Sequence, residues 1–340
     1  MDNQLDDNRL DDRLRSKERA HHAASIVLSQ YLRATAGQRL WCFTDNGRLW
    51  LAEALATGAA GLGLAATVVN LECSGETPES VQSSLATLSP SDIVISVMSL
   101  GPVSSRYFRV FPSFRPPEGF PGRSAVIRQH YPDETLLAHL TTAPATAEAA
   151  ATRALAYDGL RRVRITAPSG TDICCELKPA QVLPYRIGDG RHVYLPPAEV
   201  AYGIVPGSAN GVIVCDITVG EFVVRGEVYD ALGLVDAPVR IAVAAGRVTG
   251  VSGGDIATRF AACLARIDRE QPAGSDGRAV VELGFGLSES TPPIGFSAAD
   301  ECLQGTCHFG IGNDFFFGGK NAVPMHMDVI LRGPAKVVGR

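Results

Sequence analysis

Apolar and polar positions alternate with two different periods along this chain, and the period changes near residue 160. Before it, short apolar runs alternate with segments of helical periodicity. Such alternation is typical of a parallel sheet covered by helices, so we expect a Rossmann-like α/β domain at residues 1–160. The predicted strands are 39–44, 66–71, 92–98 and 123–129, and the predicted helices are 46–58, 78–85 and 133–160, the last interrupted at Pro144.

A charged segment precedes this domain. Residues 1–22 are rich in Asp, Arg, Lys and Glu, and a helical pattern emerges from about residue 9 to residue 34. We therefore expect a charged N-terminal helix whose first residues are disordered. Asp45 is the expected N-cap of the 46–58 helix.

After residue 160 the chain becomes a run of short strands bounded by Gly, Pro, Asp or Ser, with one predicted helix at 255–268. Consecutive strands without helices between them predict antiparallel pairing. We expect residues 161–340 to form a second, mainly antiparallel α+β domain. Its predicted strands are 161–166, 172–177, 211–218, 221–227, 239–244 and 247–251.

The composition is that of an ordinary globular protein, with 46% hydrophobic and 20% charged residues. A net charge of −5 gives no indication of a nucleic-acid partner. Residues 1–22 lack the apolar core of a signal peptide, and apolar stretches such as 58–69 are too short to span a bilayer. We therefore expect a cytoplasmic protein without a membrane partner. The eight cysteines include no CxxC pair and are predicted to be buried, reduced thiols.

A metal site is indicated between residues 282 and 328. Glu282, His308, His326 and Asp328 lie here, beside glycines or at alternating strand spacing. Histidine and carboxylate are ligands of zinc, manganese, cobalt and non-haem iron. His326 and Asp328 are two residues apart, so on a strand both side chains point to one face. Glu282 lies in an apolar run, where a metal ion offsets the cost of a buried carboxylate.

Other polar residues of the chain are candidates for roles beside this site. Lys320 and Asn321 follow a Gly-Gly turn shortly before His326, so we expect them to bind substrate, with a solvated loop lysine as the alternative. Cys307 is expected to face away from His308. Among the remaining histidines, His130 and His139 are expected in the core or on the surface, and His192 is a candidate for the cleft wall.

Four segments resemble the metallo-aminopeptidase family of the aminopeptidase T group. They are Pro197-Ala-Glu199-Val200, Glu282-Leu-Gly-Phe-Gly, Asp300-Glu-Cys-Leu-Gln-Gly-Thr-Cys-His308 and His326-Met-Asp328, in the family's order. The likeness covers roughly residues 160–330, and the first domain fits the family by architecture.

This resemblance implies a two-metal site made of Glu199, Glu282, His308, His326 and Asp328, with two zinc, cobalt or manganese ions. It implies a metalloprotease-like hydrolase that cleaves an amide or peptide bond with a metal-activated water. Glu199 or Glu282 would accept the proton of that water. A peptide or small-molecule substrate and a homodimer are further implications.

Two departures leave alternatives open. The aminopeptidases have a tyrosine where this chain has Phe315, and only 17 residues separate His308 from His326, where they have a longer loop. The Gly318-Gly319-Lys320 segment and the residues around His326 also resemble 2,5-dihydroxypyridine dioxygenases, which use one Fe(II) held by two histidines and a carboxylate. Here His308, His326 and Asp328 would form that triad.

Glu199 and Glu282 favour the hydrolase over the iron dioxygenase. Two additional carboxylates suit two hard cations better than one iron ion. In the dioxygenases a histidine ligand aligns with Glu282, and His308 has no counterpart. A non-catalytic peptide-binding relative is the third alternative, because Phe315 lacks the tyrosine hydroxyl.

Overall fold

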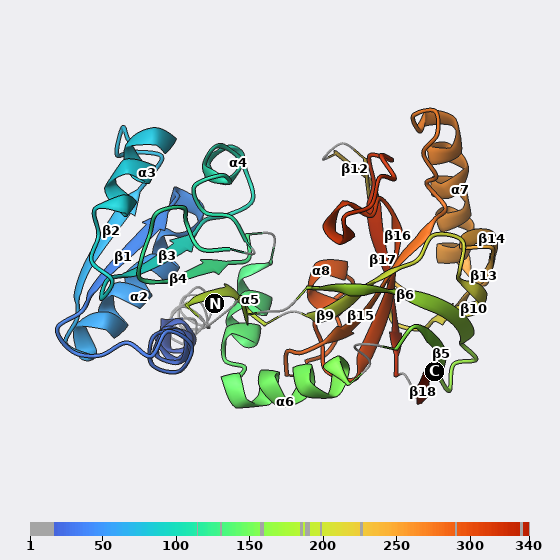
Figure 1. The fold of residues 1–340 in the computed structure, drawn as a ribbon, viewed down its shortest axis with the longest axis horizontal. Helices are drawn as coiled ribbons and strands as arrows, with labels where there is room; N and C mark the ends of the chain where they lie inside the picture. Colours follow the sequence, from blue (N-terminus) through green and yellow to red (C-terminus); the bar gives the residue numbers. More distant parts are fainter. Residues whose placement is uncertain are drawn as a thin grey trace, which may run out of the picture. The chain divides into compact units, whose positions relative to one another are not determined.

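The structure, a computed structural model, describes residues 17–113, 115–129, 131–156, 160–183, 186–187, 191–197, 199–224, 227–289, 291–333 and 336–339. The chain divides into two units (Figure 1). The first comprises Met1–Ala145 and Tyr185–Pro197, and the second comprises Thr146–Pro184 and Ala198–Arg340. The chain thus returns to the first unit after it has begun the second. The predicted boundary at residue 160 stays a prediction.

A six-stranded sheet forms the first unit, in the order β2-β1-β3-β4-β8-β7. All its pairs are parallel except that of β7 with β8 at the edge. The parallel sheet confirms the α/β class expected for this part of the chain, whereas the Rossmann-like assignment stays a proposal. The strands are β1 (Arg39–Thr44), β2 (Ala65–Asn70), β3 (Ile93–Val97), β4 (Arg123–Ile127), β7 (Arg186–Ile187) and β8 (His192–Leu195).

Helices lie against this sheet. Helix α2 contacts β1, β2 and β3, and Asp45 accepts a hydrogen bond from the Arg48 backbone at 2.9 Å, as expected of the N-cap. Phe43, Val94 and Val126 pack with apolar residues of α3 and α4 in a buried cluster. The helical elements of this part of the chain are η1 (Val27–Tyr31), η2 (Asn46–Arg48), α2 (Leu49–Gly61), α3 (Pro78–Ala86), α4 (Pro102–Tyr107) and α5 (Asp133–Leu140). Helix α6 (Pro144–Leu155) begins at the end of this unit and lies mostly in the second.

The second unit is built on a twelve-stranded sheet in the order β12-β11-β17-β16-β15-β9-β6-β10-β13-β14, with β5 paired to β6 and β18 to β5. The pairs among these strands are antiparallel, as the sequence predicts. The strands are β5 (Arg162–Thr166), β6 (Asp172–Leu183), β9 (Glu199–Ile204), β10 (Asn210–Cys215), β11 (Thr218–Val224), β12 (Glu227–Leu234), β13 (Val239–Ala244), β14 (Arg247–Ser252), β15 (Val280–Gly286), β16 (Thr306–Gly312), β17 (His326–Arg332) and β18 (Lys336–Gly339).

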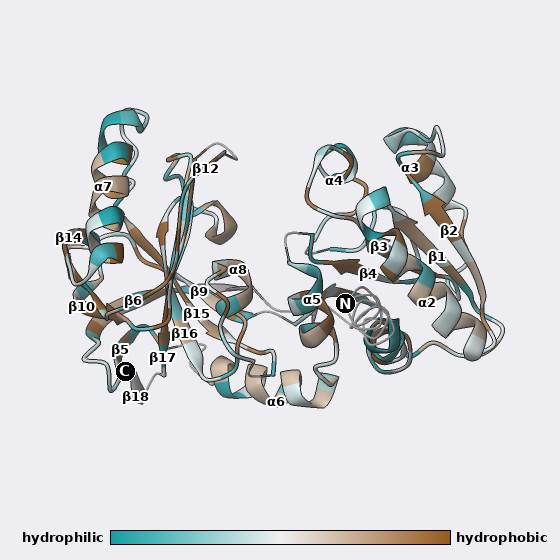
Figure 2. Cartoon of the chain, turned by 180° about the vertical axis from the view of Figure 1, so that it is seen from behind, coloured by the Kyte–Doolittle hydropathy of each residue, from teal (hydrophilic) through white to brown (hydrophobic). Residues whose placement is uncertain are grey.

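In the described residues, the helical elements of this unit are α7 (Asp255–Glu270), α8 (Ser297–Asp300), η3 (Phe315–Phe317) and α6 from Thr146 onward. Helix α7 contacts β11 to β14 and buries one apolar stripe at helical spacing, Ile256, Phe260, Leu264 and Ile267. Figure 2 shows both hydrophilic and hydrophobic segments along α7. The stripe explains why α7 packs on the sheet.

All eight cysteines are free. Most are buried, as predicted, but Cys73 is exposed and Cys174 is partly exposed, because neither lies on a fully covered strand face. Among the described residues, no helix has the length and apolar character needed to cross a bilayer.

Candidate metal centre

Strands β9, β15, β16 and β17 lie side by side and bring the five predicted ligands together. Directly opposed residues of an antiparallel pair have side chains on the same face. Each ligand has a glycine as its partner on a neighbouring strand, so ligands and glycines alternate across this face. The pairs are Glu199 with Gly286, Glu282 with Gly203 and Gly310, His308 with Gly284, Asp328 with Gly310, and His326 with Gly312.

These glycines provide the room in which the ligands lie. A Cβ atom at Gly284 would be 2.1 Å from Cε1 and Nε2 of His308 and 3.0 Å from Oε2 of Glu199. One at Gly310 would be 2.7 Å from Cβ of Glu282 and 2.8 Å from Nε2 of His326. The functional side chains therefore extend over the glycine positions, which no larger residue can occupy without displacing them.

Glu282 stands between the two histidines. Its Oε1 lies 3.6 Å from Nε2 of His308, and its Oε2 lies 3.0 Å from Nε2 of His326. Each histidine has a second carboxylate nearby. The distance from His308 Nε2 to Glu199 Oε2 is 2.9 Å, and that from His326 Nε2 to Asp328 Oδ1 is 3.5 Å.

Several of these buried atoms lack an aligned hydrogen bond. They are both ring nitrogens of His308, Oε2 of Glu199 and Oδ1 of Asp328. Buried polar atoms are usually paired, so this concentration of polar atoms without an aligned hydrogen bond requires an explanation. Nitrogen and oxygen donors around a shared space fit a divalent cation. The residues present therefore suit a metal centre.

Three groupings bring ligand atoms within 4.8 Å of one another. Each combines one histidine with two carboxylates: Glu199, Glu282 and His308; Glu282, His326 and Asp328; and Glu301, His308 and Asp328. Glu282 is shared by the first two groupings. Glu301, the buried residue that directly follows α8, was not predicted as a ligand from the sequence. The acid beside it in the same motif, Asp300, instead accepts hydrogen bonds from Thr218, Ile294 and Gly295.

The electrostatics of the cluster favour protonated histidines when no cation is bound. Burial lowers the pKa of His308, but contact with Glu199 and Glu282 outweighs it and raises that pKa well above 6.5. The pKa of His326 is likewise raised, because Asp328 and Glu282 outweigh burial. Burial raises the pKa of Glu282, but the two histidines lower it below 4.5 overall. A bound cation would take the place of these protons.

His326 is oriented by a backbone group. Its Nδ1 lies 2.9 Å from the Asn313 carbonyl oxygen, which can only accept, so Nδ1 carries the proton. Nε2 then faces Glu282 and Asp328, and it offers a lone pair to a cation only once its own proton has left. Such a contact fixes the tautomer and the ring plane of a metal-ligating histidine.

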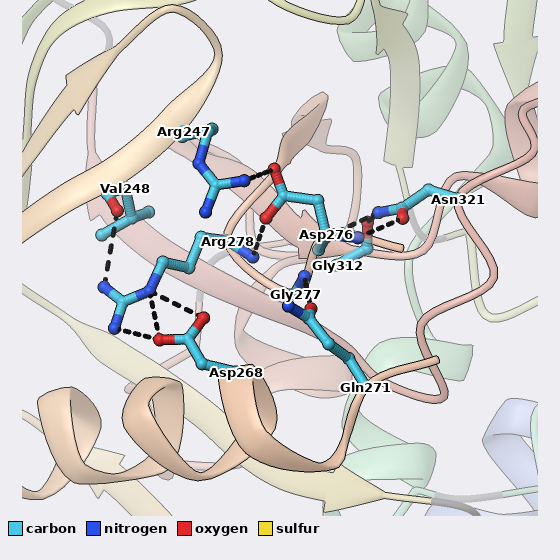
Figure 3. Close-up of polar contacts among 9 residues, drawn as sticks. All are labelled: Arg247, Val248, Asp268, Gln271, Asp276, Gly277, Arg278, Gly312 and Asn321. Carbon is cyan, nitrogen blue, oxygen red and sulfur yellow. Dashed lines mark hydrogen bonds and ion pairs between the residues drawn. The ribbon is translucent and has the colours of Figure 1, made fainter. Parts of the chain in front are cut away.

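Asn321 and Lys320, both predicted to bind substrate, lie in different environments. The Asn321 amide donates to the carbonyl oxygens of Asp276 and Gly312, each at 2.7 Å, and accepts from the Asp276 backbone at 2.8 Å (Figure 3). These contacts fasten the loop between β16 and β17. Lys320 is exposed. A contact of either residue with substrate stays a prediction.

The other residues singled out from the sequence are not among the ligands, since His139 and His192 belong to the first unit and Cys307 precedes His308 on β16. His139 is buried, and burial lowers its pKa to about 4. His192 is buried between Ser124 Oγ at 2.8 Å and the Ser113 carbonyl oxygen at 3.0 Å, so it belongs to the core of the first unit. His130 lies outside the described residues. Cys307 is buried, with its pKa raised by burial to about 12.

Residues 124–336 match the model of a family described as 2,5-dihydroxypyridine 5,6-dioxygenase. No curated protein matches the chain. Two solved structures share its fold. The 2,5-dihydroxypyridine dioxygenase from Pseudomonas putida KT2440 has a TM-score of 0.63 and 16% identity, covering 93% of this chain and 92% of that one. Wild-type AmpT from Thermus thermophilus has a TM-score of 0.58 and 15% identity, covering 94% of both chains.

Proposed function

The chain belongs to the 2,5-dihydroxypyridine 5,6-dioxygenase family, and within it we propose a metal-dependent hydrolase that uses two divalent cations to cleave an amide or peptide bond. Glu282 carries this proposal. One of its oxygens faces His308 and the other faces His326. A carboxylate that presents one oxygen to each of two donor groups suits a ligand that bridges two ions.

His308 and His326 fall into different groupings of ligand atoms, which also supports two ions. Each of the three groupings contains a single histidine with two carboxylates. A mononuclear iron centre of the facial-triad type instead needs two histidines and one carboxylate around one ion. Hard oxygen ligands outnumber imidazoles here, which suits zinc, manganese or cobalt in pairs.

Glu199, Glu282 and His308 would hold one ion, and Glu282, His326 and Asp328 the other. Bound there, the ions would supply a nucleophilic water and stabilise negative charge on the substrate oxygen. Glu199 is the more accessible of the two glutamates to a bound water, because its side chain is 14% exposed whereas that of Glu282 is 7% exposed. Both oxygens of Glu282 are also engaged by histidines. The proton of the attacking water would therefore pass to Glu199 and then to the leaving amine.

Substrate recognition is part of the proposal. Lys320, exposed on the loop before His326, would contact a negatively charged group of a peptide or small-molecule substrate. Phe315 offers no hydroxyl group, so the backbone and the ions would have to stabilise the oxyanion. We retain the expected homodimer as a proposal.

A second function, oxygen-dependent ring cleavage by one Fe(II), is favoured by the family match. The relative from Pseudomonas putida is a dioxygenase by name. In this chain the triad would be His308, His326 and Asp328, with Glu199 and Glu282 left as additional carboxylates. Because of Glu199 and Glu282, the candidate ligands of this chain include two carboxylates more than a two-histidine, one-carboxylate triad.

Metal analysis combined with turnover separates the two functions. The protein would be purified, stripped and reloaded with zinc, manganese, cobalt or iron(II), and its bound metal counted. Amide, lactam and dihydroxy-aromatic substrates would then be supplied in air and under nitrogen. We expect two ions per chain and amide cleavage in both atmospheres. Turnover that requires oxygen and one iron per chain would refute the hydrolase proposal.

A further inference from the structure

We propose that Lys178 is a positioning residue for the metal ligand His326, acting through a buried ion pair with Asp314. This inference depends on the proposed function, because it assumes that two ions bind and that His326 holds one of them. Lys178 lies on β6 and Asp314 follows β16, so the pair joins parts of the chain that are 136 residues apart. Neither residue was singled out from the sequence.

The pair is largely shielded from water. Lys178 Nζ lies 3.1 Å from Oδ2 of Asp314 and 3.4 Å from the Phe317 carbonyl oxygen. The side chains are 16% and 4% exposed, respectively. Removing one partner of such a pair leaves an uncompensated charge in the interior, so the surrounding loop would have to rearrange.

Asp314 organises the turn that follows it. Its Oδ1 accepts from the Asn321 backbone at 2.9 Å, and its carbonyl oxygen accepts from the backbones of Phe317 and Gly319, each at 3.0 Å. A Cβ atom at Gly319 would lie 1.7 Å from Cγ of Asp314. The turn therefore wraps closely around this carboxylate, and only glycine fits at position 319.

Asp314 is connected to the metal ligand His326 through the peptide group that precedes it. The carbonyl oxygen of Asn313, which accepts from His326 Nδ1 at 2.9 Å, belongs to the peptide bond between Asn313 and Asp314. That peptide bond is planar, so a shift of the Asp314 backbone also moves this oxygen. Asn313 is itself held by Met325, through its backbone at 2.9 Å and its amide at 2.8 Å.

Lys178 also lies over the same face as the ligands. A Cβ atom at Gly203, the residue opposite Glu282 on β9, would be 3.0 Å from Cδ of Lys178 and 2.7 Å from Cβ of Phe317. The lysine stem therefore crosses the sheet beside Glu282 before its ammonium group reaches Asp314. A cation in this place does not ligate metal, and its charge is matched by Asp314, which leaves it the role of holding the turn.

The test compares metal affinities of the metal-free, full-length protein. Lys178→Met keeps the aliphatic stem and removes the charge, whereas Lys178→Arg keeps both the charge and a donor for Asp314. Stepwise cobalt(II) binding would be followed by calorimetry and by the cobalt absorption spectrum. We expect Lys178→Met to weaken one of the two binding steps about tenfold, as loss of an outer-shell contact does, and Lys178→Arg to stay close to wild type.

Arg278→Met is the matched control. Arg278 lies in the same unit and pairs with Asp268 at 2.7 Å (Figure 3). Among the described residues, its side chain hydrogen-bonds Asp268 and the Val248 carbonyl oxygen and no metal ligand. This variant should bind both ions as the wild type does. If Lys178→Met fails to fold, Asp314→Asn replaces it, because the amide keeps an acceptor for Asn321 and removes the charge.

The outcomes separate this inference from the proposed function. Wild-type affinity for both ions in Lys178→Met, or equal weakening of both steps in a folded Asp314→Asn protein, would overturn the role of Lys178. A wild-type protein that binds no divalent cation would instead refute the metal site itself.

Discussion

Gly284 lies directly opposite His308 across the β15–β16 pair, and a methyl group at Gly284 would be 2.1 Å from the Nε2 atom of that histidine. Gly284→Ala should therefore displace the imidazole without altering any ligand. We expect at least a tenfold loss of metal affinity, together with about 1–3 kcal/mol of lost stability from overpacking. Metal titration and chemical denaturation of the purified variant measure the two effects.

Gly250→Ala is the control for this prediction. Gly250 lies on β14, and the nearest atom to its added methyl group would be the Cβ of Ala242 at 3.9 Å. Its metal content should equal that of the wild type. Full metal content in Gly284→Ala as well would show that the imidazole does not need this space.

Glu282→His tests the bridging role. Replacing a shared carboxylate with imidazole removes negative charge that helps hold two cations close together. We expect bound metal to fall from two ions to one and hydrolysis to be lost. Elemental analysis and an amide-cleavage assay measure this. A variant that gains iron and oxygen-dependent activity would instead support the dioxygenase function.

The metal-free protein should lose stability as the pH rises above 6.5. The pKa values of His308 and His326 are raised in the folded state, so their contribution is complete below 6.5 and disappears as pH passes through the raised values. Metal binding needs neutral imidazole, so metal affinity should rise over the same range. Thermal unfolding with and without a chelator measures both trends from about pH 6, just below the ordinary histidine pKa of about 6.5, to about pH 9. A metal-free melting temperature that increases with pH would contradict the charge state described for the cluster.

His139 predicts a separate acid sensitivity in the first unit. Its folded pKa is about 4, against an ordinary value of 6.5, because burial disfavours the charged ring. Stability should therefore be lost as pH falls from 6.5 toward 4, by about 3 kcal/mol. His139→Phe should flatten this dependence, whereas His21→Phe, at an exposed position, should not. Denaturation midpoints across this pH range provide the measurement.

Phe315 and Phe316 are expected to form an apolar edge of the site. They are 56% and 60% exposed, on the turn that begins next to Asn313 and the ligand His326. Replacing both with Ala should lower kcat/KM at least tenfold for substrates with an aromatic group, because about 1.5–3 kcal/mol accompanies burial of a phenyl group. Small aliphatic substrates should be unaffected. Phe108→Ala, at an exposed position of the first unit, is the control.

Local pattern was sufficient for most elements. Strands β1 and β13 have the predicted bounds, and Pro144 separates two helices because it begins α6. The same period-two argument predicted that His326 and Asp328 share a face. In the structure His326 Nε2 lies 3.5 Å from Asp328 Oδ1. These features depend on neighbours in sequence, which is why periodicity reveals them.

Pairing over long distances could not be predicted in the same way. Strand β8 follows residue 160, yet it pairs with β4 in the parallel sheet of the first unit. The sequence did not predict this pairing, because register with a distant strand leaves no local signature. Glu301 and the Lys178–Asp314 pair were missed for the same reason: their partners become neighbours only when the sheet forms.

The return of the chain to the first unit at Tyr185–Pro197 has a consequence for biosynthesis. Strand β8 is the parallel neighbour of β4, so a ribosome must release residues up to Leu195 before the first sheet can be completed. By then β5 and β6 of the other unit have also emerged. A single cut at residue 160 would leave the first sheet without β8, and Glu199 follows that strand by only four residues. The two halves of this protein are therefore made as one interleaved product, and separate expression would have to join 1–145 to 185–197 by an engineered connection.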